Sequence, residues 1–306
     1  MSSVSAWISA ARPRTLPLSL SGILVGLSIS PHQGMDAPLI SLGCIVTTVL
    51  FQVLSNFAND LGDGQKGTDN ANRIGPERAV QSGAISVHQM KRAVLVLSLL
   101  SLIAAVSLIV NAIGSLSQPS LIFYLILALL CILAAITYTV GKRAYGYSGF
   151  GDIMVFLFFG IVAVLGTRHL FNVAFSLNEC LGAVAIGSWS TMVLNLNNMR
   201  DIQNDAENHK NTLAVKLGAR RAKHYHYLLF ILATSGWTIL TIRLYQDTTH
   251  WLFLLMLLPL VPMFMHVLTV RKITQAPDFD PELKKVALSA FVAAVTCYIV
   301  SIISMP

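Results

Sequence analysis

Asparagine and aspartate side chains recur at helical spacing in two parts of this chain. In the first part, Asn56, Asn59, Asp60 and Asp63 lie at the end of the apolar run 38–58. Intervals of three and four residues place these side chains on one face of a helix. Carboxylates at the end of a membrane helix are costly unless something cationic binds them. This first acidic group therefore predicts a binding site for a cation.

A second acidic group repeats the pattern near residue 200. It consists of Asn197, Asn198, Asp201 and Asp205. Its four-residue spacing matches that between Asn59 and Asp63 in the first group. The segment 79–83 is likewise echoed by 214–218, with Ala-Val at the start and Gly at the end of each. The two echoes predict an old duplication that left two related halves.

The first acidic group has no third acid at the expected position, because Gly67 stands there. Asp69 comes two residues later, and we expect Gly64 and Gly67 to end the helix and let the chain turn back. A returning chain would bring the carboxylate of Asp69 to the cation. The alternative is that Asp69 only pairs with Arg73 at the protein surface.

Carboxylate and amide oxygens are hard ligands of the kind that Mg²⁺ prefers. The predicted metal ligands are Asn59, Asp60, Asp63, Asp69, Asp201 and Asp205. Mg²⁺ uses few protein carboxylates and takes its other ligands from water and from substrate phosphate. Basic residues near both groups would suit phosphate oxygens. They are Lys66, Arg73, Arg78, Lys142, Arg200 and Lys210. The combination predicts a phosphorylated substrate bridged by metal, and the alternative is a set of structural salt bridges.

Tyrosines and cations also gather where the apolar run 120–140 ends, at Tyr138, Lys142 and Tyr145. One interpretation is an aromatic belt at the membrane surface with snorkelling cations. However, Tyr138 lies a helical turn deeper than Lys142, which a belt does not require. Both interpretations stay open on composition alone.

The elements that carry these groups are predicted to span a membrane. The chain of 306 residues is 55% hydrophobic and 11% charged, which is typical of membrane proteins. Nine apolar runs are present, at 15–31, 38–58, 93–113, 120–140, 153–171, 181–199, 226–243, 251–270 and 286–305. Several reach the ~20 residues that a spanning helix needs, and their length favours helices over a β-barrel. We expect one all-α domain over 1–306, with nine transmembrane helices in one bundle.

The distribution of charge predicts the orientation of that bundle. With nine spans and a cytoplasmic N-terminus, all but Arg168 and Arg243 of the 21 Lys and Arg fall on the cytoplasmic side. Both acidic groups then face the cytoplasm, and the C-terminus lies outside. Residues 1–14 are predicted to form an interfacial segment. The net charge of +7 reflects topology, so we do not expect nucleic-acid binding.

These motifs resemble the UbiA superfamily of intramembrane aromatic prenyltransferases. Its signatures are Asn-x-x-x-Asp-x-x-x-Asp, matched here by Asn59 and Asp63, and Asp-x-x-x-Asp, matched by Asp201 and Asp205. The spacing Tyr138-x-x-x-Lys142 resembles a third motif of the family. The likeness covers nearly the whole chain. Stretches such as 12–17, 59–69, 73–78 and 138–147 look most like the menaquinone branch, which acts on 1,4-dihydroxy-2-naphthoate.

The resemblance implies a reaction and a role for each residue. A polyprenyl group would pass from polyprenyl diphosphate to the aromatic acid, with loss of CO₂ and diphosphate, by Mg²⁺-dependent chemistry. The implied catalytic residues are Asp63, Asp201, Asp205, Tyr138 and Lys142, with Tyr138 shielding the allylic cation. The implied substrate-binding residues are Asn56, Asn59, Lys66, Arg73, Arg78, Tyr145, Asn197, Asn198, Arg200 and Lys210. The enzyme would sit in the bacterial cytoplasmic membrane among lipids, and no protein partner is inferred.

Two other functions remain as alternatives. The first is the same fold and chemistry with another acceptor, such as 4-hydroxybenzoate or homogentisate. The second is a secondary transporter, since repeats and membrane-embedded charges also occur there. The acids of this chain gather at one face of the membrane instead of its midplane, which argues against transport.

Overall fold

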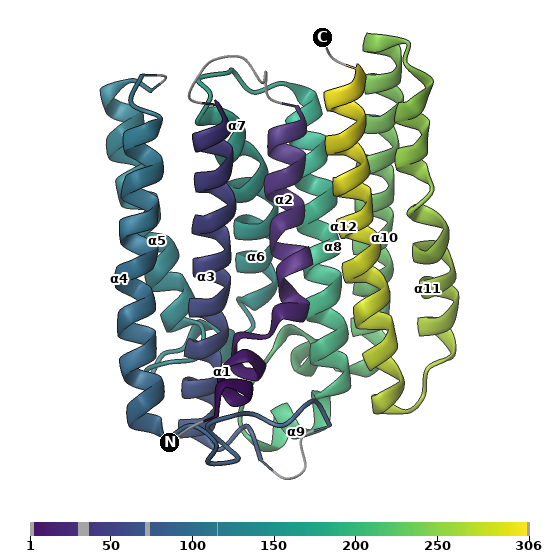
Figure 1. The fold of residues 1–306 in the computed structure, drawn as a ribbon. Coiled ribbons are helices and arrows are strands. Elements are labelled where there is room, and N and C mark those ends of the chain that lie inside the picture. The colour runs from purple at the N-terminus through teal and green to yellow at the C-terminus, as the bar shows by residue number, and fades with distance from the viewer. Residues whose placement is uncertain (1–2, 30–36, 71–73, 115, 305–306) are drawn as a thin grey trace.

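The computed structural model describes residues 3–29, 37–70, 74–114 and 116–304. Over these residues the chain is helical, and no β-strand occurs among them. The first half contains α1 (Val4–Ala11), η1 (Pro13–Thr15), α2 (Leu16–Ser28), α3 (Ala37–Lys66), α4 (Val87–Asn111) and α5 (Gln118–Thr137). Most of these helices run side by side along one direction (Figure 1). The predicted all-α class is confirmed.

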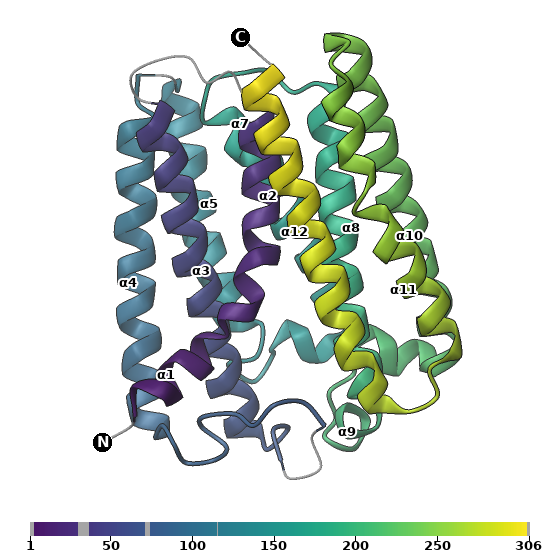
Figure 2. The same ribbon diagram turned by 45° about the vertical axis from the view of Figure 1, so that its right-hand side comes forward.

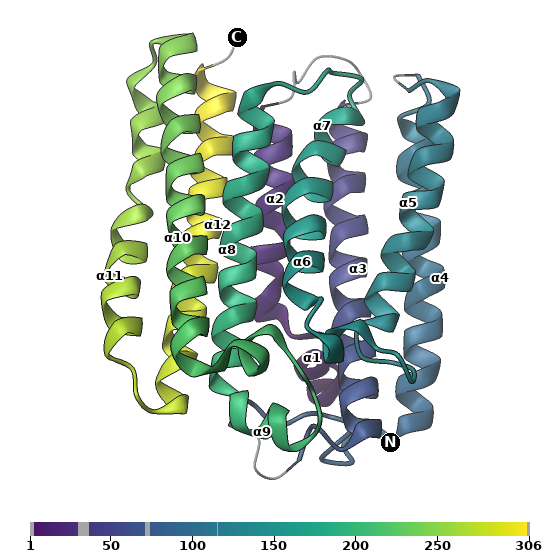
Figure 3. The same cartoon turned by 180° about the vertical axis from the view of Figure 1, so that it is seen from behind.

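The rest of the chain completes the same bundle. It contains η2 (Tyr145–Ser148), α6 (Gly151–Val155), the π-helix η3 (Phe156–Gly166), α7 (Thr167–His169), α8 (Leu177–Arg200), α9 (Ile202–Glu207), α10 (Leu213–Thr248), η4 (Trp251–Leu257), α11 (Leu260–Lys272), η5 (Ala276–Asp278) and α12 (Phe279–Ser304). Helices α4 and α5 lie at one side, and α10 and α11 lie at the other (Figure 3).

Seven described segments are long and apolar enough to cross a membrane. They comprise α3, α4, α5, residues 151–169, α10, residues 251–272 and residues 276–304. The chain is therefore an integral membrane protein. The predicted runs 15–31 and 181–199 fall on α2 and α8, which stand among the other helices (Figure 2). Because α2 is short and α8 carries several Asn and Ser residues, neither meets the same length and hydropathy criterion. The count of nine spans stays a prediction.

Small residues bring α8 into close contact with η3. A Cβ atom placed on Gly160 would lie 2.5 Å from the Ala183 carbonyl oxygen and 2.7 Å from Cα of Gly187. No larger side chain fits there, because heavy atoms do not approach so closely in a packed interior. Helix α8 also packs against α2, α10 and α12. This central position fixes the helix that carries Asn197 and Asn198 and that ends directly before Asp201.

The N-terminal segment forms a short helix that crosses the lower end of the bundle obliquely (Figure 2). Helix α1 is capped by Ser3, and its residue Trp7 contacts the ring of Phe57 at 5.4 Å between centroids. Its apolar residues Val4 and Ile8 remain exposed. A helix with one exposed apolar face fits the predicted interfacial segment.

The two halves share a detail of backbone geometry. Gly83 and Gly218 end the two echoed segments, and both adopt left-handed backbone angles, with φ of 75° and 74°. A residue with a Cβ atom rarely adopts this conformation, which explains glycine at both places. The shared geometry agrees with the predicted duplication.

Candidate active site

Residues of both acidic groups line one polar cavity of about 270 Å³. Helices α3 and α8 run in the same direction, so their C-terminal ends meet at the lower end of the bundle, near α9 (Figure 1). From the two groups and the turn after α3, the lining residues are Asn59, Asp63, Asp69, Asn197, Asn198, Asp201 and Asp205. The sequence spacing therefore identified side chains that the fold brings together.

Lys210 lies between the two acidic groups. Its Nζ is 3.4 Å from an oxygen of Asp63 and 3.7 Å from an oxygen of Asp205. Burial alone would lower the pKa of Lys210, but the carboxylates of Asp63 and Asp205 outweigh that effect and raise it above the ordinary value. Lys210 therefore pairs with one acid from each half of the molecule.

Arg200 orients the second acidic group from within α8. It donates to both carboxylate oxygens of Asp201, at 2.9 and 2.6 Å, and to the side-chain oxygen of Asn197 at 2.8 Å. It also pairs with Asp280 on α12. A guanidinium bonded to a carboxylate in this forked way fixes the angle as well as the position of the acid. Asp201 is thus held in one orientation, and α8 is tied to α12.

Asp69 reaches the cavity because the chain reverses after α3. Gly67 has a φ of 73°, and the N–H of Thr68 bonds the Asp63 carbonyl oxygen at 3.1 Å. This is the glycine-dependent way of ending a helix. The predicted stop at Gly67 is confirmed, whereas α3 continues through Gly64. Asp69 is buried, 3.8 Å from Nε of Arg78.

A second, apolar cavity of about 340 Å³ adjoins the polar one. Both cavities share wall residues that include Asn59 and Tyr138. The ring of Tyr138 meets that of Tyr145 edge-on, with 5.2 Å between centroids. Tyr145 lines only the apolar cavity, and its hydroxyl donates to the carbonyl oxygen of Ala134 at 2.9 Å. Tyr138 therefore stands at the junction of a polar and an apolar space.

Some predicted site residues lie elsewhere. Asp60 accepts backbone N–H bonds from Ala79 and Val80 through its two oxygens, both at 3.1 Å, and does not line the cavity. It shapes the loop after α3 instead of facing the cavity. Asn56 donates to the Ala11 carbonyl oxygen at 2.8 Å and lines the apolar cavity.

Two basic residues are also displaced from the predicted positions. The spacing Tyr138-x-x-x-Lys142 assumes a continuous helix, but α5 ends at Thr137 and Lys142 lies exposed in the following turn. Lys66 lies outside the cavity wall, with Nζ 3.9 Å from the ring centre of Tyr147. Arg73 lies outside the described residues.

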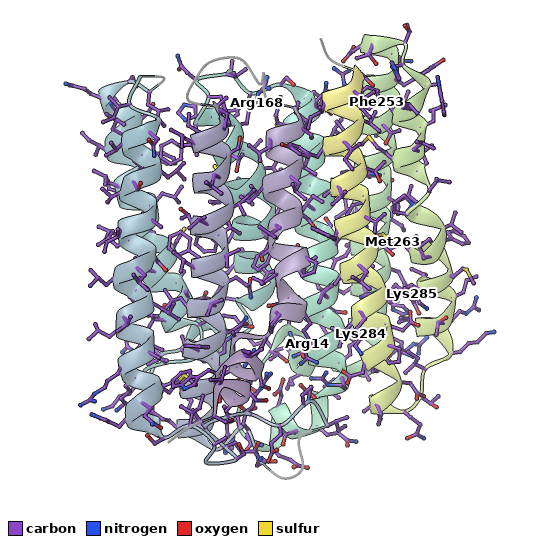
Figure 4. The ribbon with its side chains drawn as sticks, viewed as in Figure 1. Arg14, Arg168, Phe253, Met263, Lys284 and Lys285 are labelled. Atoms are coloured by element: carbon purple, nitrogen blue, oxygen red, sulfur yellow. The ribbon has the colours of Figure 1, made fainter. Side chains whose placement is uncertain are left out.

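Four charged residues that line the cavity were not predicted as site residues. They are Arg12, Arg14, Asp280 and Lys284. Figure 4 shows Arg14 and Lys284 at a similar level of the bundle, on η1 and α12. The sequence offered one signal for Arg12 and Arg14, their place in a stretch that resembles the family. Lys284 belongs to a mixed-charge segment that gives no such signal.

Sequence similarity to known proteins defines the class to which this chain belongs. Residues 19–301 match the UbiA prenyltransferase family, and the chain belongs to it. It is 42% identical over 255 residues to the 1,4-dihydroxy-2-naphthoate octaprenyltransferase of Escherichia coli (strain K12), covering 83% of this chain and 82% of that protein. It is 35% identical over 295 residues to the Mycobacterium leprae protein of the same name, covering 96% and 95%.

A solved structure shares the fold. The UbiA homologue from Archaeoglobus fulgidus bound to GPP and Mg²⁺ superposes with a TM-score of 0.65 over 96% of this chain and 99% of that one. The two sequences are 13% identical, so this likeness concerns the fold alone.

Proposed function

We propose that this chain transfers a polyprenyl group from polyprenyl diphosphate to 1,4-dihydroxy-2-naphthoate, in the biosynthesis of menaquinone. The bond from the allylic carbon to the diphosphate oxygen breaks. A new carbon–carbon bond forms at the ring carbon that bears the carboxylate, and the carboxylate leaves as CO₂. The product is demethylmenaquinol. The relatives that are 42% and 35% identical carry this acceptor in their names, which supports the choice of substrate.

The junction of the two cavities at Tyr138 carries the proposal. A prenyl diphosphate has a highly charged head and a long apolar tail, joined at the carbon that reacts. The polar cavity supplies basic side chains for the head, and the adjoining cavity supplies an apolar wall for the tail. The reacting carbon then lies beside Tyr138, whose aromatic face shields positive charge.

The donor set of the polar cavity fits Mg²⁺. No group of three or more His, Cys, Asp or Glu in the described ranges forms a ready-made metal cage. Mg²⁺ needs only one or two carboxylates when phosphate supplies other oxygens. One or two carboxylates from among Asp63, Asp201 and Asp205 would therefore bind it together with phosphate oxygens, with Asn59 and Asp69 beside them. The bound ion would supply positive charge to stabilise the diphosphate as it leaves.

The basic residues of the chain would bind the head group directly. The basic side chains that line the polar cavity include Arg12, Arg14, Arg78, Lys210 and Lys284. Arginine and lysine placed on several sides of a diphosphate bind its charge and fix its orientation. We place the protein in the bacterial cytoplasmic membrane with this cavity facing the cytoplasm.

The test is an assay of the purified chain in lipid nanodiscs with a polyprenyl diphosphate and a panel of acceptors. Prenylated product should form with 1,4-dihydroxy-2-naphthoate and only weakly with 4-hydroxybenzoate or homogentisate. EDTA should abolish transfer and Mg²⁺ should restore it. A clear preference for another acceptor would reassign the substrate, and full activity in EDTA would refute the metal-dependent reaction.

A further inference from the structure

Tyr147 contacts both halves of the site without lining either cavity. It belongs to η2, the short helix between α5 and α6. Its hydroxyl donates to Oδ1 of Asp63 at 2.8 Å and lies 2.5 Å from Oγ1 of Thr68. A phenol has one proton, so Thr68 must be the donor in the second bond. The hydroxyl therefore joins the first acidic group to the turn that follows α3.

The ring of Tyr147 lies near two lysines, and its backbone bonds the loop before α10. Nζ of Lys66 lies 3.9 Å from the centre of its ring, and Nζ of Lys210 lies 5.5 Å from it. Both distances are within the range of cation–π attraction. The carbonyl oxygen of Tyr147 accepts the N–H of Asn211 at 3.1 Å. One residue thus touches the acid, the turn and the loop that carries Lys210.

These contacts leave Asp63 few alternative orientations. One carboxylate oxygen is bonded to Tyr147 and the other lies 3.4 Å from Lys210. Without the phenol, Oδ1 of Asp63 and the hydroxyl of Thr68 would each lose a partner. The carboxylate could then rotate, and the turn at 67–69 that carries Asp69 would lose an anchor.

We propose that Tyr147 is a positioning residue, whose hydroxyl orients Asp63 and holds the turn at 67–69 so that both acidic groups face one metal–diphosphate complex. The inference rests on the proposed function, because it assigns Asp63 to the metal. Groups that hydrogen-bond a metal ligand typically alter metal affinity or activity by about 10- to 100-fold when removed. The same range is expected for Tyr147.

The test variant is Tyr147→Phe, which keeps the ring over Lys66 and the backbone bond to Asn211 but removes the hydroxyl. The Mg²⁺ concentration for half-maximal activity should rise about 10- to 100-fold, and excess Mg²⁺ should restore most of the turnover. A second readout is the rise in Tm caused by Mg²⁺ with inorganic diphosphate, which should shrink at a fixed Mg²⁺ concentration. A merely structural role would lower the Tm without metal and leave the Mg²⁺ requirement unchanged.

Tyr245→Phe is the matched control, because this partly exposed tyrosine lies near the C-terminal end of α10, in the turns before Thr248, and should behave as wild type. If Tyr147→Phe does not fold, Thr68→Val removes the donor to the phenol with little change of shape and should shift the Mg²⁺ requirement in the same direction. A wild-type Mg²⁺ requirement and Tm response in the variant that folds would overturn the inference. Asp63→Asn separates a failure of this inference from a failure of the proposed function. If Asp63→Asn abolishes metal-dependent transfer while Tyr147→Phe behaves as wild type, only the positioning role of Tyr147 is refuted.

Discussion

Asp63 and Asp205 share the ammonium group of Lys210, whereas Asp201 is fixed by Arg200. Each acid of the cavity therefore has a basic side chain beside it, which offsets the cost of burying charge. The same cations are available to a phosphate that enters the cavity. From the sequence, the alternative to a metal-bridged phosphorylated substrate was a set of structural salt bridges between these acids and bases. The structure shows that these ion pairs line a polar cavity.

Lys210→Gln should lower kcat/KM by about 100-fold or more, because it removes a fixed charge aimed at the diphosphate. The raised pKa keeps Lys210 charged at all pH values below its ordinary pKa of about 10.4, so no loss through this group is expected near neutral pH. Lys142→Gln is the matched comparison and should leave kcat/KM close to wild type, since that side chain is exposed. Equal losses in the two variants would contradict the placement of both residues.

Asp69→Asn separates a site role from a surface ion pair. The side chain of Asp69 is only 3% exposed and lines the cavity, so its loss should raise the Mg²⁺ requirement about tenfold or more and lower turnover with the fold intact. A surface pair would contribute less than ~1 kcal/mol and leave both quantities unchanged. A Mg²⁺ titration of the variant that overlays wild type would exclude the ligand role.

Residue types and spacing were sufficient to place Asn59 and Asp63 on one face of α3, because a four-residue interval keeps side chains together on a helix. They were not sufficient for Asp60, which binds the backbone of the following loop, and Asp201 stands at the break between α8 and α9. The same argument failed for Lys142, because α5 stops before it. Lys284 and Tyr147 could not be found this way. Their positions depend on how α12 and the segment after α5 pack, which no local spacing records.

At the scale of elements, the segment from Tyr138 to Gly151 holds Tyr138 at the junction of the polar and apolar cavities. It bends back on itself, with the N–H of Gly146 bonded to the Tyr138 carbonyl oxygen at 3.0 Å. A Cβ atom on Gly151 would lie 3.1 Å from the Tyr138 hydroxyl oxygen and 3.4 Å from Cδ2 of Leu194. The absence of a side chain at Gly151 therefore leaves room for the tyrosine ring.

Gly151→Ala should push the ring of Tyr138 away from the junction of the cavities. If that ring shields the allylic cation, water should capture more of the cation, and the ratio of diphosphate to prenylated product should rise by about tenfold, on the scale of a small misplacement near the reacting atoms. The control is Gly114→Ala, where a Cβ atom would meet nothing within 4 Å. An unchanged ratio would show that Tyr138 does not shield the cation.

The helices themselves were largely predictable, since long apolar runs have few alternatives in a membrane. The π-helical stretch η3 was not predictable, and the break between η4 and α11 was indicated only as a kink. The π-helical stretch contacts α2 and α8, and Pro259 stands at the break before α11. The sequence does indicate a kink at this proline, but tertiary packing decides how the two parts continue.

At the scale of the whole molecule, both acidic groups lie at one end of a membrane bundle. The loop that follows α3 lies at that end, as does α9 (Figure 1). The apolar cavity adjoins the polar one and is lined by residues of several helices, among them α2, α3 and α5. A site arranged in this way can take a soluble aromatic acid from one side and a lipid-like donor from the membrane. This arrangement explains why such a reaction would belong to an integral membrane protein.

The predicted topology rests on the distribution of Lys and Arg. A periplasmic reporter fused after Pro306 should be active, and the same reporter inserted between Gly75 and Gly83 should be inactive, because basic loops stay in the cytoplasm. The measurement is the ratio of periplasmic to cytoplasmic reporter activity for each fusion. Activity at the second position would place the cavity on the other side of the membrane.

The two acidic groups are proposed to drive prenyl transfer with loss of the carboxylate. The most direct measurement uses purified chain, polyprenyl diphosphate and carboxyl-labelled 1,4-dihydroxy-2-naphthoate. CO₂, diphosphate and prenylated product should appear in equal amounts with Mg²⁺, and Asp201→Asn should reduce all three about 100-fold or more. Product that retains the carboxyl label, or equal rates in wild type and Asp201→Asn, would contradict the account.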